Sequence, residues 1–304
     1  MLDMIKAIIY GIVEGITEWL PISSTGHLIL VEQFLPFKNV SEGFFEMFDV
    51  VIQLGAILAV VVLFFWKLWP FYINGAKKKR IQFEENEKDI AVGKLALSMN
   101  AFFMWLKIVV ACIPAVIYGV LLDDVVEELF GKTIGTSTVT IKAFVVVAML
   151  LIVGILFILV ENKNKDKETK VKDINSITYK QAFIIGLFQL VAAALPGTSR
   201  SGSTILGGIA IGIDRVIASE FTFFLGIPVM FGASLLKVLK FGFVFTTTEL
   251  ALLGVASLVS FVVSLAVIKF LMSYIKKHDF KVFGYYRIIL ALIVFSYFMI
   301  RIFA

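Results

Sequence analysis

Cysteine and histidine are almost missing from this chain of 304 residues, which has one cysteine, Cys112, and two histidines. A single cysteine excludes an intrachain disulfide and any metal site built from several thiolates. Charged residues are scarce as well, at 17% of the chain, whereas a soluble globular domain has about 25%. The net charge is +5, but the basic residues lie in connections between apolar runs, so we expect no nucleic-acid partner.

Long apolar runs fill most of the remaining sequence. Apolar residues make up 60% of the chain, and the mean hydropathy is +0.96. A helix needs about 20 mainly apolar residues to cross the hydrocarbon core of a membrane. Six runs predict such spans: Phe44–Trp66, Leu106–Leu122, Ile141–Val160, Phe221–Val238, Leu250–Met272 and Tyr286–Phe303. We therefore predict an all-α polytopic membrane protein with about six full transmembrane helices.

Lysine and arginine gather in three of the connections between these runs. The rich connections extend from Lys77 to Lys94, from Lys163 to Lys180 and from Lys276 to Lys281, and the alternate connections hold few cations, such as Lys38, Lys132 and Lys240. Because cytoplasmic loops carry the excess of Lys and Arg, the positive-inside rule places the three rich connections in the cytoplasm.

Two polar segments share one sequence frame. Residues 14–27 read Glu-Gly-Ile-Thr-Glu-Trp-Leu-Pro-Ile-Ser-Ser-Thr-Gly-His, and residues 195–202 read Leu-Pro-Gly-Thr-Ser-Arg-Ser-Gly. The same spacing separates each matching pair: Gly11 and Gly186, Glu14 and Gln189, Pro21 and Pro196, and Ser24 and Ser199. An odd number of predicted spans lies between the copies. The sequence thus predicts one integral membrane domain built from an inverted-topology repeat, with halves of approximately residues 1–162 and 175–304.

Each polar segment interrupts an apolar helix. Pro21 lies in the first segment and Pro196 in the second, and both are followed by glycines and hydroxyl residues. Proline lacks a backbone donor and disfavours helix at the preceding residue. Both segments therefore predict a re-entrant helix-loop-helix, which the membrane tolerates only inside protein or beside a wet cavity. Two ordinary kinked spans are the alternative.

The first segment supplies acids and a histidine, and the second supplies an arginine. Glu14 and Glu18 lie four residues apart and share one helix face. Two acids and Arg200, left unpaired at the centre of a bilayer, would together cost roughly 8–10 kcal/mol. Neighbouring carboxylates suit a divalent cation such as Mg²⁺ or Ca²⁺, and a guanidinium suits a phosphate. A purely structural ion pair is the alternative, but it leaves His27 and the hydroxyls unexplained.

Hydroxyl groups beside this cluster could react or could cap helices. Ser24 becomes a nucleophile if a base lies within hydrogen-bond reach, and a histidine such as His27 is the usual base. His27 could also accept a phosphoryl group itself. Backbone N–H groups at the start of a helix attract anions, so both turns favour a phosphate.

At these positions the sequence resembles the bacterial undecaprenyl-diphosphate phosphatase family, which is associated with bacitracin resistance. The resemblance extends to residues 48–55, 219–225 and 285–287, with Asp49 where relatives are expected to have glutamate. It implies hydrolysis of undecaprenyl diphosphate to undecaprenyl phosphate with a divalent cation, Mg²⁺ or Ca²⁺. It also implies a homodimer among the lipids of the bacterial cytoplasmic membrane, with an active site that opens to the outer face.

The resemblance also implies roles for individual residues. It assigns catalysis to Glu18, Ser24, His27 and Arg200, and the cation to Glu14 and Glu18. It assigns the substrate-binding shell to Ser23, Thr25, Gly26, Ser199, Ser201, Gly202 and Thr204. We expect Ser24 to attack the terminal phosphorus with His27 as its base, although attack by His27 stays open.

Three other functions compete with this one. A lipid-carrier flippase or other transporter would use the same inverted repeats and midplane polar site. A type-2 phosphatidic acid phosphatase would need a histidine after the Ser199-Arg200 pair, and none follows before His278. A non-catalytic drug-binding protein is the third alternative.

Overall fold

The computed structural model describes residues 2–38, 40–73, 89–92, 94–122, 125, 126, 128, 141–165 and 167–303. The basic residues from Lys77 to Lys88, and Lys132, on which the orientation prediction partly rests, lie outside the described residues.

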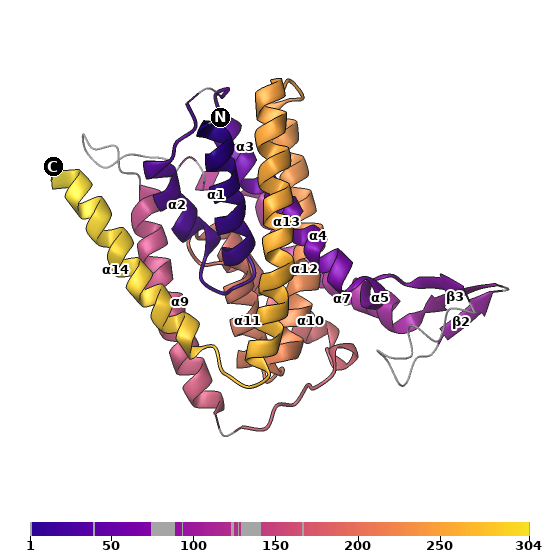
Figure 1. Ribbon diagram of the computed structural model, residues 1–304. Coiled ribbons are helices and arrows are strands. Elements are labelled where there is room, and N and C mark those ends of the chain that lie inside the picture. Colours follow the sequence, from indigo (N-terminus) through magenta and orange to yellow (C-terminus); the bar gives the residue numbers. More distant parts are fainter. Residues whose placement is uncertain are drawn as a thin grey trace.

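Helices form nearly all of the described chain (Figure 1). In order, the α-helices are α1 (Leu2–Thr17), α2 (Ser24–Phe34), α3 (Phe44–Val51), α4 (Gln53–Leu63), α5 (Phe65–Leu68), α7 (Met99–Leu121), α9 (Ile141–Asn164), α10 (Tyr179–Ala194), α11 (Arg200–Ala210), α12 (Arg215–Phe241), α13 (Thr247–Ile275) and α14 (Lys281–Phe303). A short 3₁₀ helix covers Ile174–Ser176.

One small sheet was not predicted. Strands β1 (Phe71–Ile73), β2 (Asp89–Val92) and β3 (Leu95–Ser98) are antiparallel and lie in the order β1-β3-β2. Phe71 pairs with Leu97, and Asp89 pairs with Ser98. The sheet projects from the helical body beyond α5 and α7 (Figure 1), so it does not contribute to the two polar turns.

The prediction of six membrane-spanning segments is confirmed. The helices long and apolar enough to cross a membrane are Phe44–Leu63, Met99–Leu121, Ile141–Asn164, Arg215–Phe241, Thr247–Ile275 and Lys281–Phe303. Several begin before the predicted apolar run because a polar residue caps them. Ser98 caps α7, Asp214 caps α12 and Thr246 caps α13, each by accepting a backbone N–H bond.

The two halves pack their first helices in the same way. α1 lies along α13, and α10 lies along α7. A Cβ atom at Gly11 would overlap the carbonyl of Ala256, and one at Gly186 would overlap the carbonyl of Ala111. The matching glycines therefore permit the same close helix contact in each half. This equivalence is what a repeat predicts, while the inverted orientation of the halves stays a prediction.

Both polar segments break their helices as predicted. α1 ends at Thr17 and α2 begins at Ser24, while α10 ends at Ala194 and α11 begins at Arg200. The first turn lies within the apolar core: Trp19 is fully buried and meets the ring of Phe223 edge-on, with centroids 5.1 Å apart. The backbone of the turn is thus enclosed by protein, and its re-entrant placement in a membrane stays a prediction.

Candidate active site

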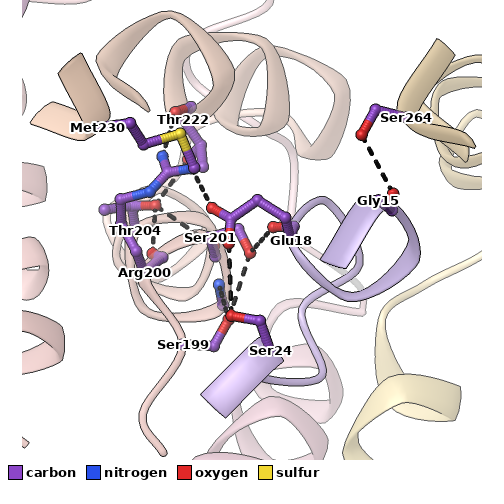
Figure 2. Close-up of polar contacts among 11 residues, drawn as sticks. Gly15, Glu18, Ser24, Ser199, Arg200, Ser201, Thr204, Thr222, Met230 and Ser264 are labelled. Atoms are coloured by element: carbon purple, nitrogen blue, oxygen red, sulfur yellow. Dashed lines mark hydrogen bonds and ion pairs between the residues drawn. The ribbon is translucent and has the colours of Figure 1, made fainter. Parts of the chain in front are cut away.

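The two broken-helix turns meet in the interior. Arg200 Nη2 donates to Glu18 Oε1 at 2.7 Å, although 182 residues separate them in the chain. Ser201 Oγ adds a bond to the main-chain oxygen of Glu18 at 2.8 Å. Figure 2 shows Glu18 between Ser24 on one side and Arg200 on the other. The acidic segment and the basic segment therefore form a single polar site.

The turns share an unusual backbone conformation at the residue that caps the second helix. Ser23 has φ 74° and Ser199 has φ 71°, and among the described residues these are the only non-glycine positions with positive φ. The side chain of Ser23 accepts from Gly26 N at 3.3 Å, and that of Ser199 accepts from Gly202 N at 3.1 Å. The two serines are therefore structurally equivalent, as a repeat predicts.

This equivalence corrects the predicted alignment of the two segments. The constant spacing pairs Ser24 with Ser199, but the shared capping geometry pairs Ser23 with Ser199. The second turn contains one more residue between its proline and its capping serine, so the match shifts by one position after Pro196. As a result, Ser24 and Arg200 occupy the same place, the first residue of the second helix.

Glu18 connects the hydroxyl of the first turn to the guanidinium of the second. Its Oε1 accepts from Arg200, and its Oε2 accepts from Ser24 Oγ at 3.4 Å. Only 7% of the Glu18 residue is exposed. The bond to Ser24 is long, but hydrogen bonds in substrate-free active sites are often loose and tighten when substrate binds. Glu18 is thus placed to accept a proton from Ser24.

Further contacts fix the Arg200 side chain. Its Nη1 donates to the carbonyl of Thr222 at 3.0 Å, and its guanidinium lies 6.0 Å from the centroid of the Trp19 ring. Thr204 Oγ1 donates to the carbonyl of Arg200 at 2.8 Å and accepts from Thr222 Oγ1 at 2.9 Å. The Thr204 hydroxyl therefore bonds to its own helix and to α12, and its role toward substrate stays a prediction.

Both ring nitrogens of His27 form hydrogen bonds, and neither bond involves Ser24. Nδ1 lies 2.7 Å from the carbonyl oxygen of Ser23, and Nε2 lies 2.7 Å from the hydroxyl of Tyr286. Because a carbonyl can only accept, Nδ1 carries the proton and Nε2 accepts from Tyr286. Among the contacts described, none joins His27 to Ser24. The expected Ser24–His27 pair is thus not formed in this structure, and the Ser24 hydroxyl bonds to Glu18 instead.

The remaining predicted shell residues line the same two turns. Thr25 and Gly26 belong to the first turn of α2, and Ser201 and Gly202 belong to the first turn of α11. Gly26 is buried, and a Cβ atom there would lie 3.2 Å from Leu150. These four residues therefore lie directly after the two turns.

Glu14 is the most isolated polar group of the site. It is fully buried, and neither carboxylate oxygen has a hydrogen-bond partner within the described chain. One oxygen of Asp49, Oδ1, is likewise buried and unpartnered. An ionised carboxylate left in this state is costly, so Glu14 requires either a proton or a cation.

These carboxylates fit a cation that is shared with a substrate. The described residues contain no group of three or more His, Cys, Asp or Glu side chains that could hold a metal ion by themselves. Magnesium, however, is usually held by one or two carboxylates together with substrate phosphate. Glu14 and Glu18 are two carboxylates one helical turn apart, and their binding of a divalent cation stays a prediction.

Arg287 was assigned no role from the sequence. It is fully buried in α14 and donates to the carbonyls of Pro21 at 3.3 Å, Gly197 at 2.8 Å and Thr198 at 3.0 Å. Arg287 thus bonds both turns to each other. It forms no ion pair with a carboxylate in the part of the chain that is described, so its positive charge lies uncompensated behind the site. The signal in the sequence is a lone charge near the start of the last apolar run.

Comparison with known proteins yields one consistent result. A model of the bacitracin resistance protein BacA family matches residues 7–293. The chain is 54% identical over 301 residues to the undecaprenyl-diphosphatase of Desulfitobacterium hafniense, covering 99% of this chain and 98% of the relative. It is 51% identical over 299 residues to undecaprenyl-diphosphatase 1 of Clostridium acetobutylicum, covering 98% of each. It is 50% identical over 293 residues to an undecaprenyl-diphosphatase of Enterococcus faecalis, covering 96% of each. The chain therefore belongs to the BacA family of bacitracin resistance proteins.

Proposed function

We propose that this protein is an undecaprenyl-diphosphate phosphatase. It hydrolyses undecaprenyl diphosphate to undecaprenyl phosphate and inorganic phosphate, which recycles the lipid carrier for cell-wall synthesis and confers bacitracin resistance. The single observation that carries the proposal is the contact of Glu18 with both Ser24 and Arg200 inside a multi-pass membrane protein. Relatives that share half of its residues over the full length bear the name of this enzyme.

Binding of the diphosphate relies on positive charge from three sources. Arg200 offers a planar fork of donors that matches two phosphate oxygens. The helices α2 and α11 both begin at the two turns, and a helix N-terminus attracts anions through its backbone N–H groups and its dipole. Arg287 adds the charge behind the turns. A phosphate bound here competes with Glu18 for Arg200 and thereby frees the carboxylate to act as a base.

The chemical step follows from the hydrogen bond between Ser24 and Glu18. The Ser24 hydroxyl transfers its proton to Glu18 as Oγ attacks the terminal phosphorus. The bond from that phosphorus to the bridging oxygen breaks, and undecaprenyl phosphate leaves. Water then hydrolyses the phosphoserine and releases inorganic phosphate. His27, held by Ser23 and Tyr286, lies one turn beyond Ser24, and it is the second candidate for proton transfer or attack.

Glu14 and Glu18 are the residues that would hold a divalent cation, Mg²⁺ or Ca²⁺. When bound, the cation neutralises charge on the diphosphate, which is the main demand of phosphoryl transfer. The support for this assignment is the buried and unpartnered Glu14 carboxylate.

The remaining features of the proposal concern location and assembly. The family resemblance implies that the protein lies in the bacterial cytoplasmic membrane with its site open to the outer face. The described lysines from Lys163 to Lys180 favour a cytoplasmic position for their own connection. Grooves between apolar helices hold the polyprenyl tail. The homodimer rests on the family resemblance alone.

The decisive test is phosphate release from undecaprenyl diphosphate by purified protein, with Mg²⁺, with Ca²⁺ and with EDTA. We expect divalent-dependent release that is lost in Glu18→Gln, Ser24→Ala and Arg200→Ala and lowered in His27→Ala. A flippase without hydrolase activity, the alternative function, would release no phosphate under any of these conditions. An unchanged rate in EDTA would remove the cation from the proposal.

A further inference from the structure

A second polar feature lies away from the two turns, at one end of the spanning helices. A groove of about 410 Å³ forms where α4 and α5 end, α12 begins and α13 ends. Its lining mixes apolar side chains with Lys67, Lys269, Lys276 and the carboxylate of Glu220. A basic groove at the end of a spanning bundle needs an explanation beyond packing, because apolar lipid cannot solvate the charges.

One of the lysines is neutralised within the wall of the groove. Lys67 Nζ donates to both carboxylate oxygens of Glu220 at 3.1 Å. Glu220 is 7% exposed, so this ion pair is largely shielded from solvent. The pair fixes α5 against α12 and leaves Lys67 facing the groove with its charge balanced.

Lys269 and Lys276 carry the positive charge of the groove that Glu220 does not balance. Both side chains are exposed on α13 and at its end, and neither belongs to an ion pair within the described residues. With three lysines against one carboxylate, the groove has an excess of positive charge that would be complemented by an anion.

Aromatic residues place the groove at the depth of the lipid headgroups. Trp66 lines the groove and is 40% exposed, and Trp69, just beyond it, is 49% exposed. Tryptophan gathers at the boundary between hydrocarbon and water, and lysines near helix ends extend their charge to the same level. Leu63 and Ile268 line the groove on the side nearer the centres of α4 and α13. Lys276 lies at the end of α13, whereas Lys269 follows Ile268 directly and reaches the headgroup level by extending its long side chain.

We propose that this groove binds an anionic phospholipid, with its phosphate headgroup at Lys269 and Lys276 and an acyl chain against Leu63 and Ile268. Basic pockets between spanning helices on the cytoplasmic side are suited to anionic headgroups. The connection after α13 is one of the three basic connections, so the leaflet is the cytoplasmic one. The site is independent of the proposed hydrolysis, since none of its lining residues belongs to the two turns.

The test measures lipid binding by native mass spectrometry on the full-length protein, titrated with phosphatidylglycerol or phosphatidylcholine. We expect preferential retention of phosphatidylglycerol. Lys269→Gln combined with Lys276→Gln should weaken its binding roughly 10- to 30-fold, because each lysine near an anionic headgroup contributes about fivefold. The corresponding double arginine variant should bind as the wild type does. Neither pair of substitutions disturbs Lys67 or Glu220, and phosphate release from the diphosphate in detergent should stay unchanged as a check of folding.

The matched control is Lys163→Gln combined with Lys165→Gln, which removes the same charge from an exposed stretch at the end of α9. If this control variant lost as much phosphatidylglycerol binding as the Lys269 and Lys276 variant, the loss would reflect net charge alone. That result would overturn the proposed site. Equal binding of the two phospholipids would overturn it as well. Stronger retention of undecaprenyl phosphate than of phosphatidylglycerol would assign the groove to the polyprenyl product, and displacement by millimolar inorganic phosphate would reduce it to a simple anion site. Either result would overturn the phospholipid assignment.

Discussion

The two broken-helix turns have the same backbone and different chemistry. Each places a serine with positive φ before its second helix and caps that helix through the same side-chain bond. At the next position the first turn has Ser24 and the second has Arg200. A strained turn that occurs twice thus presents a serine hydroxyl from one side and a guanidinium from the other. Backbone strain at such positions costs about 1–3 kcal/mol and is typical of functional sites.

The helices that lead into the turns differ in charge and agree in burial at one pair of matching positions. Glu14 and Gln189 occupy matching positions, both are buried, and both carry side-chain oxygens without a hydrogen-bond partner in the described chain. Glu18, by contrast, is matched by Ala193. Glu18 is buried whereas Ala193 is exposed, so only the pair Glu14 and Gln189 agrees in burial, and the acids belong to the first segment alone. In the proposed mechanism the first segment therefore supplies the acids and the second supplies the cation that binds the diphosphate.

The largest expected difference between the two turns comes from replacing Ser24, the proposed nucleophile of the first turn. We expect Ser24→Ala to lower kcat by at least about 10³-fold, because removing a nucleophile abolishes the covalent route. Phosphate release from undecaprenyl diphosphate under saturating substrate measures it. Ser203→Ala is the matched control, since Ser203 is a buried serine of α11 whose hydroxyl bonds to the Phe188 carbonyl, and it should retain most activity. A near-normal kcat in Ser24→Ala would mean that Ser24 is not the nucleophile and would favour attack by His27.

The second turn is tested by replacing Arg200 with lysine, which keeps the positive charge and removes the planar guanidinium. Arg200→Lys should lower kcat/KM by roughly 10²–10³-fold, because an ammonium cannot reproduce two parallel bonds to a phosphate. Phosphate release across a range of substrate concentrations measures it.

Arg215→Lys is the matched control for this substitution. Arg215 also forms a paired contact with a buried acid, Glu161, but it does so at the start of α12, away from the turns. That variant should lose stability and keep its kcat. If both arginine variants lost activity equally, Arg200 would be a structural residue rather than a phosphate ligand.

Much of this arrangement could be predicted from the sequence, and the errors have physical causes. Apolar runs predicted all six spans, because length and hydropathy suffice for a membrane-spanning helix. The meeting of Glu18 and Arg200 followed from the cost of leaving charges unpaired in an apolar interior. The alignment of Ser24 with Ser199 was wrong by one residue, because the capping bond and the backbone conformation decide equivalence and are not visible in the residue letters.

Two further features could not be predicted for a different reason. The partner of the Ser24 hydroxyl depends on which of two nearby groups, Glu18 or His27, is already engaged. His27 is held by Tyr286, a residue from the other end of the chain. The charge of Arg287 is visible near the start of the last apolar run, but its partners are main-chain carbonyls of both turns, and those partners have no sequence signature. Long-range contacts of this kind are fixed only by the packed structure.

A smaller effect is expected when the matching buried residues Glu14 and Gln189, in the helices before the turns, are changed. We expect Glu14→Gln to raise the Mg²⁺ concentration needed for half-maximal activity by roughly 10-fold or more, because a ligand charge is lost. Titration of phosphate release with Mg²⁺ measures the change. Gln189→Glu, which gives the second half the acid of the first, should leave that concentration within about threefold of the wild type. The reverse pattern would place the cation on the second half.

The smallest expected effect concerns the serines that the two turns share. Replacing Ser23 or Ser199 by Ala removes the capping oxygen and should lower the free energy of unfolding by about 1 kcal/mol. Gly in place of either serine costs only a few tenths of a kcal/mol as a cap and relieves the positive-φ strain, so each Gly variant should be at least as stable as the wild type. The midpoint of thermal unfolding in one fixed detergent ranks the four variants. If the two turns are equivalent in energy as well as in geometry, the Ala and Gly variants will fall in the same order at both positions. A difference at only one turn would mean that the repeat preserves the shape of the backbone while its stability is set by the neighbours of each half.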